Sequence, residues 1–199
     1  MVIGAIGNVL VKDVLRDGTG RVVGVRATVM DPATGRRTAE TEEHTADLVL
    51  AADGNSTRTA VAAGLHRRTD RPMGVAVRTY YRSPRSELDW MEGWLELQDG
   101  TSPQRSLLPG YGWVFGVGDG TANVGLGILD TSPAFGTLDY RAVLRDWVAS
   151  MPADWTFDPE HQVGRIGSAA LPMAGNRTPH YVPGLMLLGD SAGLVSPFN

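Results

Sequence analysis

Two short stretches place aspartate beside glycine at the end of an apolar run. Asp53 and Gly54 follow LVLAA, and Gly189 and Asp190 follow LMLL. A carboxylate at such a bend can accept hydrogen bonds from a ribose or ribitol hydroxyl. Glycine at the bend lets a ligand approach the backbone closely. The two stretches therefore indicate a nucleotide-binding site.

The residues after each bend read as the start of a helix. Ser56 is the expected N-cap of a short helix over 56–65, and Arg58 lies in its first turn. Ser191 and further small residues follow the second bend. A helix start attracts anions, but a strand–turn–helix junction with Asp-Gly also occurs as a purely structural turn. Only the pair of motifs, in this order, makes the binding interpretation specific.

Composition excludes several classes of protein. The chain has 199 residues, a formal net charge of −4 and no cysteine, which excludes disulfides and thiol chemistry and argues against a nucleic-acid partner. Its four histidines are scattered, so we expect no metal site. The sequence has no run long enough to span a membrane and no signal peptide. We expect a cytoplasmic protein.

The elements that must position the two bends are strands. The first fifty residues read as a β-meander, and the run at 46–53 is apolar enough to be a strand buried on both faces. The run at 186–188 reads as a second buried strand. Between them, alternating segments at 73–82, 93–98, 111–117 and 121–129 predict an antiparallel sheet.

A helix follows that sheet. Apolar residues from Tyr140 to Met151 recur at helical spacing and form one stripe, and Thr137 is the expected cap.

Asp119-Gly120 predicts a two-residue hairpin turn between the last two strands of this sheet. This register places Phe115 opposite Val124 and Trp113 opposite Leu126. It assigns Tyr111, Trp113 and Phe115 to one face, and Gly125 and Gly127 to the other. Strand glycines often mark the close approach of a ligand, although an aromatic stripe is more often core.

At this point the sequence resembles a family. ADGNSTR and GLMLLGDSAG are similar to the D-G and G-D motifs of FAD-dependent enzymes with the para-hydroxybenzoate hydroxylase fold. GYGWVFGVGDGTANVGLG further resembles the Y-x-W-x-F-P-(eight residues)-G-x-G signature of geranylgeranyl reductases. Tyr111, Trp113, Phe115, Gly125 and Gly127 match that signature, whereas Gly116 stands where the family usually has proline.

The resemblance implies a mixed α/β (α+β) fold, in which a partial Rossmann-like FAD-binding domain is interrupted by an inserted antiparallel-sheet substrate domain. We expect the FAD-binding parts at 1–68 and 171–199 and the substrate domain at 69–170. The implied cofactor-binding residues are Asp53, Gly54, Arg58, Gly189, Asp190, Ser191, Pro197 and Phe198. The implied substrate-binding residues are the five that match the signature.

The implied reaction is reduction of carbon–carbon double bonds in a polyprenyl group by reduced FAD, with NADPH or another electron donor. The substrate would be a geranylgeranyl lipid, geranylgeranyl diphosphate or the menaquinone side chain, which implies peripheral membrane contact. The proton donor is unassigned, because Tyr111, with an ordinary pKa of ~10, would be a poor acid.

Two alternatives stay open. An aromatic hydroxylase of the same superfamily shares the D-G and G-D motifs. The third possibility is an inactive piece that binds no FAD by itself, because the G-x-G-x-x-G phosphate loop is absent from these residues. We therefore expect an internal piece of a longer protein, which would purify without colour when expressed alone.

Overall fold

The computed structural model describes residues 8–99 and 105–196. These residues form two compact units. Unit 1 combines residues 1–71 with residues 172–199, and unit 2 consists of residues 72–171. Each unit has its own core of buried apolar side chains.

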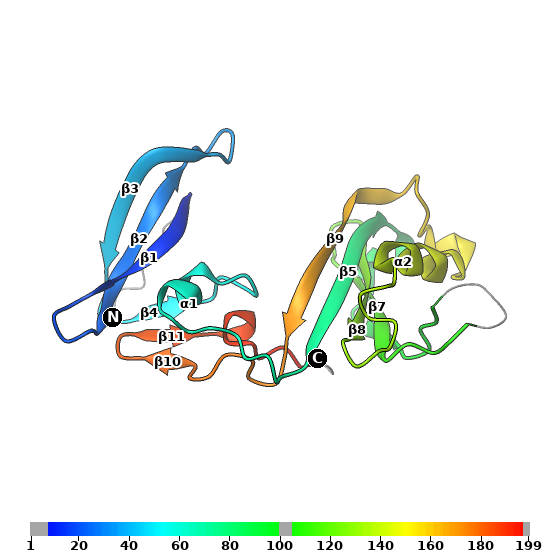
Figure 1. Ribbon diagram of the computed structural model, residues 1–199. Helices are drawn as coiled ribbons and strands as arrows, with labels where there is room; N and C mark the ends of the chain where they lie inside the picture. The colour runs from blue at the N-terminus through cyan, green and yellow to red at the C-terminus, as the bar shows by residue number, and fades with distance from the viewer. Residues whose placement is uncertain (1–7, 100–104, 197–199) are drawn as a thin grey trace. The chain divides into compact units, whose positions relative to one another are not determined.

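Unit 1 begins with an antiparallel meander. Strands β1 (Val9–Arg16), β2 (Val22–Met30) and β3 (Arg37–Thr45) form a three-stranded sheet in that order (Figure 1). A carboxylate oxygen of Asp17 accepts hydrogen bonds from the backbone of Thr19 and Arg21, which closes the first turn. The meander supplies Val14 and Val22 to the core of unit 1.

A second sheet of unit 1 joins the two apolar runs that precede the Asp-Gly and Gly-Asp bends. Its strands are β10 (Tyr181–Val182), β11 (Leu185–Leu187) and β4 (Val49–Ala51), with β11 parallel to β4. Ala51 and Leu187 pair and are buried.

The prediction that residues 46–53 and 186–188 are buried throughout is wrong. Leu50 and Met186 also pair, but they are 53% and 41% exposed, and Leu188 is 38% exposed. The physical reason is the alternation of side chains along a strand. Ala51 and Leu187 point into the core of unit 1, so their neighbours Leu50 and Met186 point to the opposite face.

The short helix α1 (Arg58–Ala62) follows β4. Thr57, rather than Ser56, is its N-cap, because the Thr57 side chain accepts a hydrogen bond from the backbone of Ala60. Thr57 is fully buried, whereas Ser56 is exposed and donates to Asn55. The sequence offered two adjacent hydroxyl residues, and burial decides between them.

Unit 2 is built on a five-stranded sheet in the order β6-β7-β8-β5-β9. Its strands are β5 (Met73–Arg82), β6 (Met91–Trp94), β7 (Gly110–Gly116), β8 (Thr121–Leu129) and β9 (Gln162–Pro172). The strand expected at 93–98 thus begins and ends earlier. Strand β9 was not predicted, because Gly164 and Gly167 interrupt its apolar alternation.

The predicted register of the β7–β8 hairpin is wrong by one residue. Val117 donates its backbone N–H to Thr121, so three residues rather than two form the turn. Asp119 stabilises this turn by accepting hydrogen bonds from the backbone and hydroxyl of Thr121. Trp113 consequently lies opposite Gly125, and Phe115 lies opposite Asn123.

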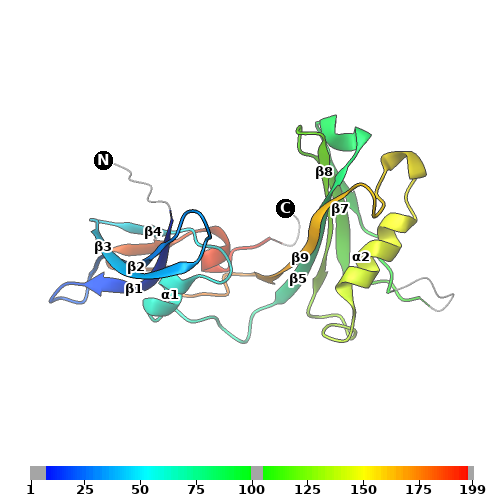
Figure 2. The same cartoon turned by 90° about the horizontal axis from the view of Figure 1, so that it is seen from above.

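Helix α2 (Tyr140–Ala149) packs on one face of this sheet (Figure 2). Asp139, rather than Thr137, caps it, because the Asp139 carboxylate accepts from the backbone of Arg141 and Ala142. The Thr137 hydroxyl instead donates to the backbone of Ala134. The short helices η1 (Pro84–Glu87) and η2 (Ala153–Trp155) adjoin the same face.

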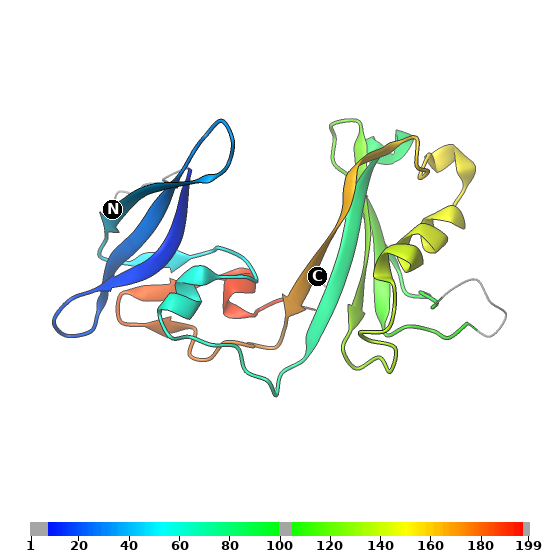
Figure 3. The ribbon, with the colours of Figure 1, turned by 45° about the horizontal axis from the view of Figure 1, so that its top comes forward.

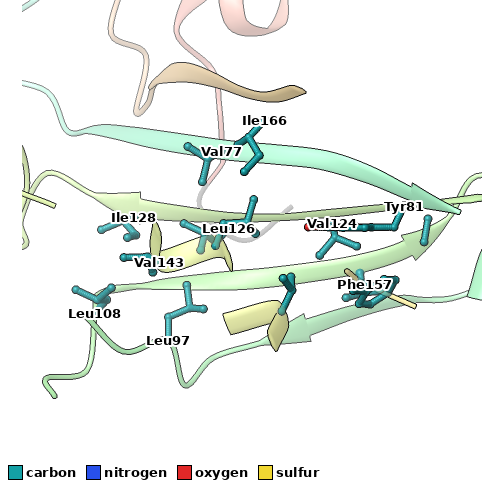
Figure 4. Packing of buried hydrophobic residues seen from close by; sticks show 14 residues of the cluster. Val77, Tyr81, Leu97, Leu108, Val124, Leu126, Ile128, Val143, Phe157 and Ile166 are labelled. Carbon is teal, nitrogen blue, oxygen red and sulfur yellow. The ribbon is translucent and has the colours of Figure 1, made fainter. Parts of the chain in front are cut away.

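The buried core of unit 2 lies between α2 and the sheet (Figure 4). Val114, Val124 and Leu126 are fully buried there. These positions alternate with the residues of the other face, which we call the open face because it retains solvent exposure.

Candidate functional site

The two bends lie at the same edge of one sheet. Because β4 and β11 are parallel neighbours, their carboxyl ends meet there, and the Asp53 and Asp190 turns follow directly. Ligands of open α/β sheets bind outside the carboxyl ends of such strands. The backbone N–H of Leu188 donates to Ala51, which ties the two turns together at 2.9 Å.

Asp53 is exposed, and its carboxylate supports helix α1. One oxygen accepts hydrogen bonds from the backbone and the hydroxyl of Thr59, at 3.1 and 3.0 Å. Gly54 has a φ of +74°, and a side chain placed on it would meet no atom within 4 Å. Arg58 begins α1 and is exposed. The turn thus presents bare backbone beside a carboxylate and an arginine.

The second turn has the same character. Strand β11 runs into the short helix η3 (Gly189–Ala192), shown after the strand in Figure 3. Gly189 has a φ of +54° with open space beside it, and Asp190 is exposed. Ser191, however, is fully buried, and its hydroxyl bonds to the backbone of Ala51 and Leu188. Its side chain therefore positions the turn.

Arg177 is a buried cation beside this edge that sequence reasoning missed. It is 3% exposed, and its guanidinium donates a hydrogen bond to the backbone carbonyl of Leu65. Its backbone N–H donates to the backbone carbonyl of Ala192. Burial lowers the pKa of Arg177, as does the nearby charge of Arg67, whereas Asp53 raises it. Arg177 thereby links the chain around both turns. No local pattern in the sequence distinguishes it from the other arginines.

Unit 2 carries the second group of candidate residues. The corrected register brings all five signature residues to the open face, since Tyr111 pairs with Gly127 and Trp113 with Gly125. The prediction that the aromatics and the glycines lie on opposite faces is therefore wrong. Strand β5 adds Arg78, which pairs with Gly125.

The aromatic side chains of the open face contact one another and the backbone. Trp113 donates its indole N–H to the side-chain oxygen of Asn123 at 2.9 Å. The rings of Tyr111 and Trp113 are 6.1 Å apart. A side chain on Gly125 would overlap the Trp113 ring, whereas one on Gly127 would have no neighbour closer than 3.8 Å. The arrangement is a half-buried aromatic surface, in which the planes of the Tyr111 and Trp113 rings are inclined by 57°, with a bare strip at Gly127.

This chain is similar to proteins that are already known, one by sequence and two by fold. The chain is 33% identical over 189 residues to a menaquinone reductase of Mycolicibacterium smegmatis, a match that covers 95% of this chain and 42% of the relative. Its fold matches a geranylgeranyl bacteriochlorophyll reductase-like protein from Thermoplasma acidophilum, with a TM-score of 0.65 and 22% identity, over 95% of this chain and 43% of that one. The resemblance to geranylgeranyl reductases is confirmed.

The fold also matches a flavoprotein/dehydrogenase from Cytophaga hutchinsonii, with a TM-score of 0.64 and 16% identity, over 96% of this chain and 43% of that one. The predicted mixed α/β fold class is thus confirmed. No family model matches the sequence. The chain spans under half the length of the menaquinone reductase that it resembles.

Other predictions are answered only in part. Pro197 and Phe198 lie outside the described residues. None of the described helices is both long enough and apolar enough to cross a membrane. Within residues 8–99 and 105–196, acidic and histidine side chains form no cluster suited to a metal ion.

Proposed function

We propose that this protein is an FAD-dependent reductase that saturates carbon–carbon double bonds in a polyprenyl group, with the menaquinone side chain as substrate. The observation that supports the proposal most is the sheet of unit 2, whose open face carries all five signature residues together. The relative named menaquinone reductase and the geranylgeranyl reductase-like structure support the same substrate class.

In this proposal unit 1 belongs to the FAD-binding domain. The turns fit the cofactor, because Gly54 and Gly189 leave bare backbone beside exposed carboxylates at one sheet edge. Asp190 would accept a hydrogen bond from a ribitol hydroxyl, and Asp53 would hold its turn in place through Thr59. Arg58 would face the dinucleotide as a cation. When bound and reduced, FAD supplies the hydride.

Unit 2 is the substrate domain in this proposal. Tyr111, Trp113 and Phe115 would hold an apolar, flat segment of the substrate, and Gly127 would let that segment approach the sheet. An apolar surface of this kind excludes water from the reacting carbons. The electron donor is NADPH or another reductant, and the substrate class would bring the protein to the membrane surface.

Flavin retention tests the cofactor site. Asp190→Ala, expressed from the complete gene, should retain at least roughly tenfold less FAD, since a charge-assisted hydrogen bond is worth about 1.5–3 kcal/mol. The flavin absorbance of the purified protein measures this loss. Asp47→Ala is a matched control, because Asp47 is an exposed carboxylate of unit 1 that bonds Arg21 through its backbone oxygen. Equal retention in both variants would remove Asp190 from the site.

Product analysis tests the reaction. The flavin-loaded protein with a reductant and menaquinone should give a product whose polyprenyl side chain has gained two hydrogens, as mass spectrometry shows after air has reoxidised any menaquinol to the quinone. Oxygen consumption coupled to a hydroxylated product would instead support the aromatic hydroxylase. A complete protein without flavin absorbance would refute both enzymes.

A further inference from the structure

The orientation of Trp113 is held by one buried side chain. Asn123 is 7% exposed and accepts the indole N–H of Trp113 at 2.9 Å. It lies on β8, on the open face, diagonally across from Trp113 on β7. An indole on a partly exposed surface could give its N–H to water, so a buried amide partner is a specific constraint.

The backbone provides a second constraint on the same ring. A Cβ at Gly125 would come within 2.7 Å of two Trp113 ring carbons, so the indole lies directly against β8. The torsion about the Cβ–Cγ bond of tryptophan has broad preferences, so contact with the backbone of Gly125 alone leaves the ring some freedom to turn about that bond. The hydrogen bond to Asn123 removes this remaining freedom.

The fixed ring borders the bare strip at Gly127. The nearest atoms to a side chain there would be Trp113 Cζ3 at 3.8 Å and Leu171 Cδ1 and the Val75 carbonyl oxygen at 3.9 Å. Gly127 is half-buried, and a Cβ there would fit in ordinary van der Waals contact with Trp113, Leu171 and the Val75 backbone. The ring atom nearest to the strip is Trp113 Cζ3, so a shift of the indole toward Gly127 would narrow the strip.

We propose that Asn123 is a positioning residue for the substrate and acts only through Trp113. By holding the indole against Gly125, it keeps the strip at Gly127 free for a flat, unsaturated segment such as an isoprene unit. The inference rests on the proposed function and adds to it a residue that determines the shape of the substrate surface. A purely structural Asn123 would stabilise the hairpin without affecting ligand binding.

A double-mutant cycle separates these roles. The variants are Asn123→Leu, which keeps the branched shape and removes the acceptor, Trp113→Phe, which removes the donor, and the double variant. The complete flavin-loaded protein is titrated with menaquinone in detergent micelles, and its dissociation constant and melting temperature are both measured. Turnover measurements then show whether KM changes while kcat is kept.

Asn123→Leu should weaken menaquinone binding roughly three- to tenfold, the range of one lost hydrogen bond. In the Trp113→Phe background the same substitution should change binding less than about twofold, because the two residues act as one unit. If Asn123→Leu does not fold, Asn123→Ala takes its place in the cycle.

Three results would overturn the proposal. A lower melting temperature with unchanged menaquinone binding would make Asn123 purely structural. Equal losses of binding in both backgrounds would show that Asn123 acts independently of Trp113. A wild-type protein that binds FAD but no menaquinone would refute the proposed substrate, and the positioning role with it.

Discussion

Each face of the unit 2 sheet carries a tryptophan that lies on a glycine. On the covered face, Trp147 of helix α2 lies over Gly112, and a Cβ there would come within 2.4 Å of the ring. On the open face, Trp113 lies over Gly125, where a Cβ would come within 2.3 Å. The two contacts are alike locally, but one joins a helix to the core and the other stays within the hairpin.

The difference between the faces is what lies beyond the tryptophan. Trp147 is part of a helix that buries Val114, Val124 and Leu126 completely. Trp113 has a half-buried ring, and the exposed Arg78 lies two strands away on β5, on the far side of Gly125. A glycine under an aromatic ring therefore indicates close packing on both faces. Only the burial of the neighbouring residues distinguishes a ring packed in the core from a ring on a surface that a ligand can reach.

The largest expected effect of breaking the covered face is on stability. Leu126→Ala removes a fully buried side chain from the centre of the core and should lower the free energy of unfolding by about 2–5 kcal/mol. Urea unfolding measures the loss. Phe115→Ala on the open face is the comparison, and it should cost less because Phe115 is half-buried. Equal losses would contradict the distinction between the faces.

Adding one methyl group under each tryptophan sharpens the comparison. Gly112→Ala and Gly125→Ala should each cost about 1–3 kcal/mol through overpacking. Gly125→Ala should cost more, because its Cβ would also come within 2.7 Å of the Val77 carbonyl oxygen, which cannot move as a side chain can.

Menaquinone binding, corrected for the folded fraction, should fall for Gly125→Ala and stay unchanged for Gly112→Ala. A loss of binding for Gly112→Ala and none for Gly125→Ala would place the ligand surface on the covered face instead of the open face.

Gly127→Ala should separate binding from stability. The new Cβ has no neighbour closer than 3.8 Å, so the free energy of unfolding should change by no more than about 0.5 kcal/mol. Menaquinone binding should weaken several-fold if the strip holds the substrate. Gly18→Ala, at an open position in unit 1, is the control for a neutral glycine substitution. Unaltered binding by Gly127→Ala would show that the strip is empty in the complex.

The smallest expected effect is that of pH on stability through Tyr81, a buried residue of the covered face. Burial raises the pKa of Tyr81 above the ordinary tyrosine value of about 10, and the charge of Asp158 raises it further, while Arg145 opposes the shift. Folding therefore favours the protonated phenol. This contribution is complete below about pH 10 and is lost as the pH rises through the folded pKa.

The free energy of unfolding, measured in urea as the pH is raised above about 10, should fall more steeply for wild type than for Tyr81→Phe. Parallel curves would show that the phenol of Tyr81 titrates alike in the folded and unfolded chains.

Much of the fold could be predicted from local patterns. The strands at 73–82, 111–117 and 121–129 and the helix that begins at Tyr140 appear where alternation and helical spacing predict them. The two apolar runs before Asp53 and Asp190 lie side by side in one sheet, as their motifs predict. The wrong N-caps at Ser56 and Thr137 each lie within two residues of the real ones.

The parts that could not be predicted depend on contacts distant in the sequence. Strand β9 is recognisable only by its place beside β5, and Arg177 is distinguished only by burial against Leu65, 112 residues away. The role of Asn123 depends on its distance to Trp113, which follows from the register of the hairpin.

The sequence by itself determined the residue types and the order of the motifs, which were sufficient to indicate a flavin enzyme with an inserted sheet. Only the tertiary structure decided which residues share a face. Side chains alternate with a period of two, so one additional residue in the turn exchanges the partners of an entire strand. The hydrogen bonds of Asp119 and Val117 select that longer turn. Burial of Val114 and Leu126 beneath α2 then leaves Trp113, Gly125 and Gly127 together on the open face.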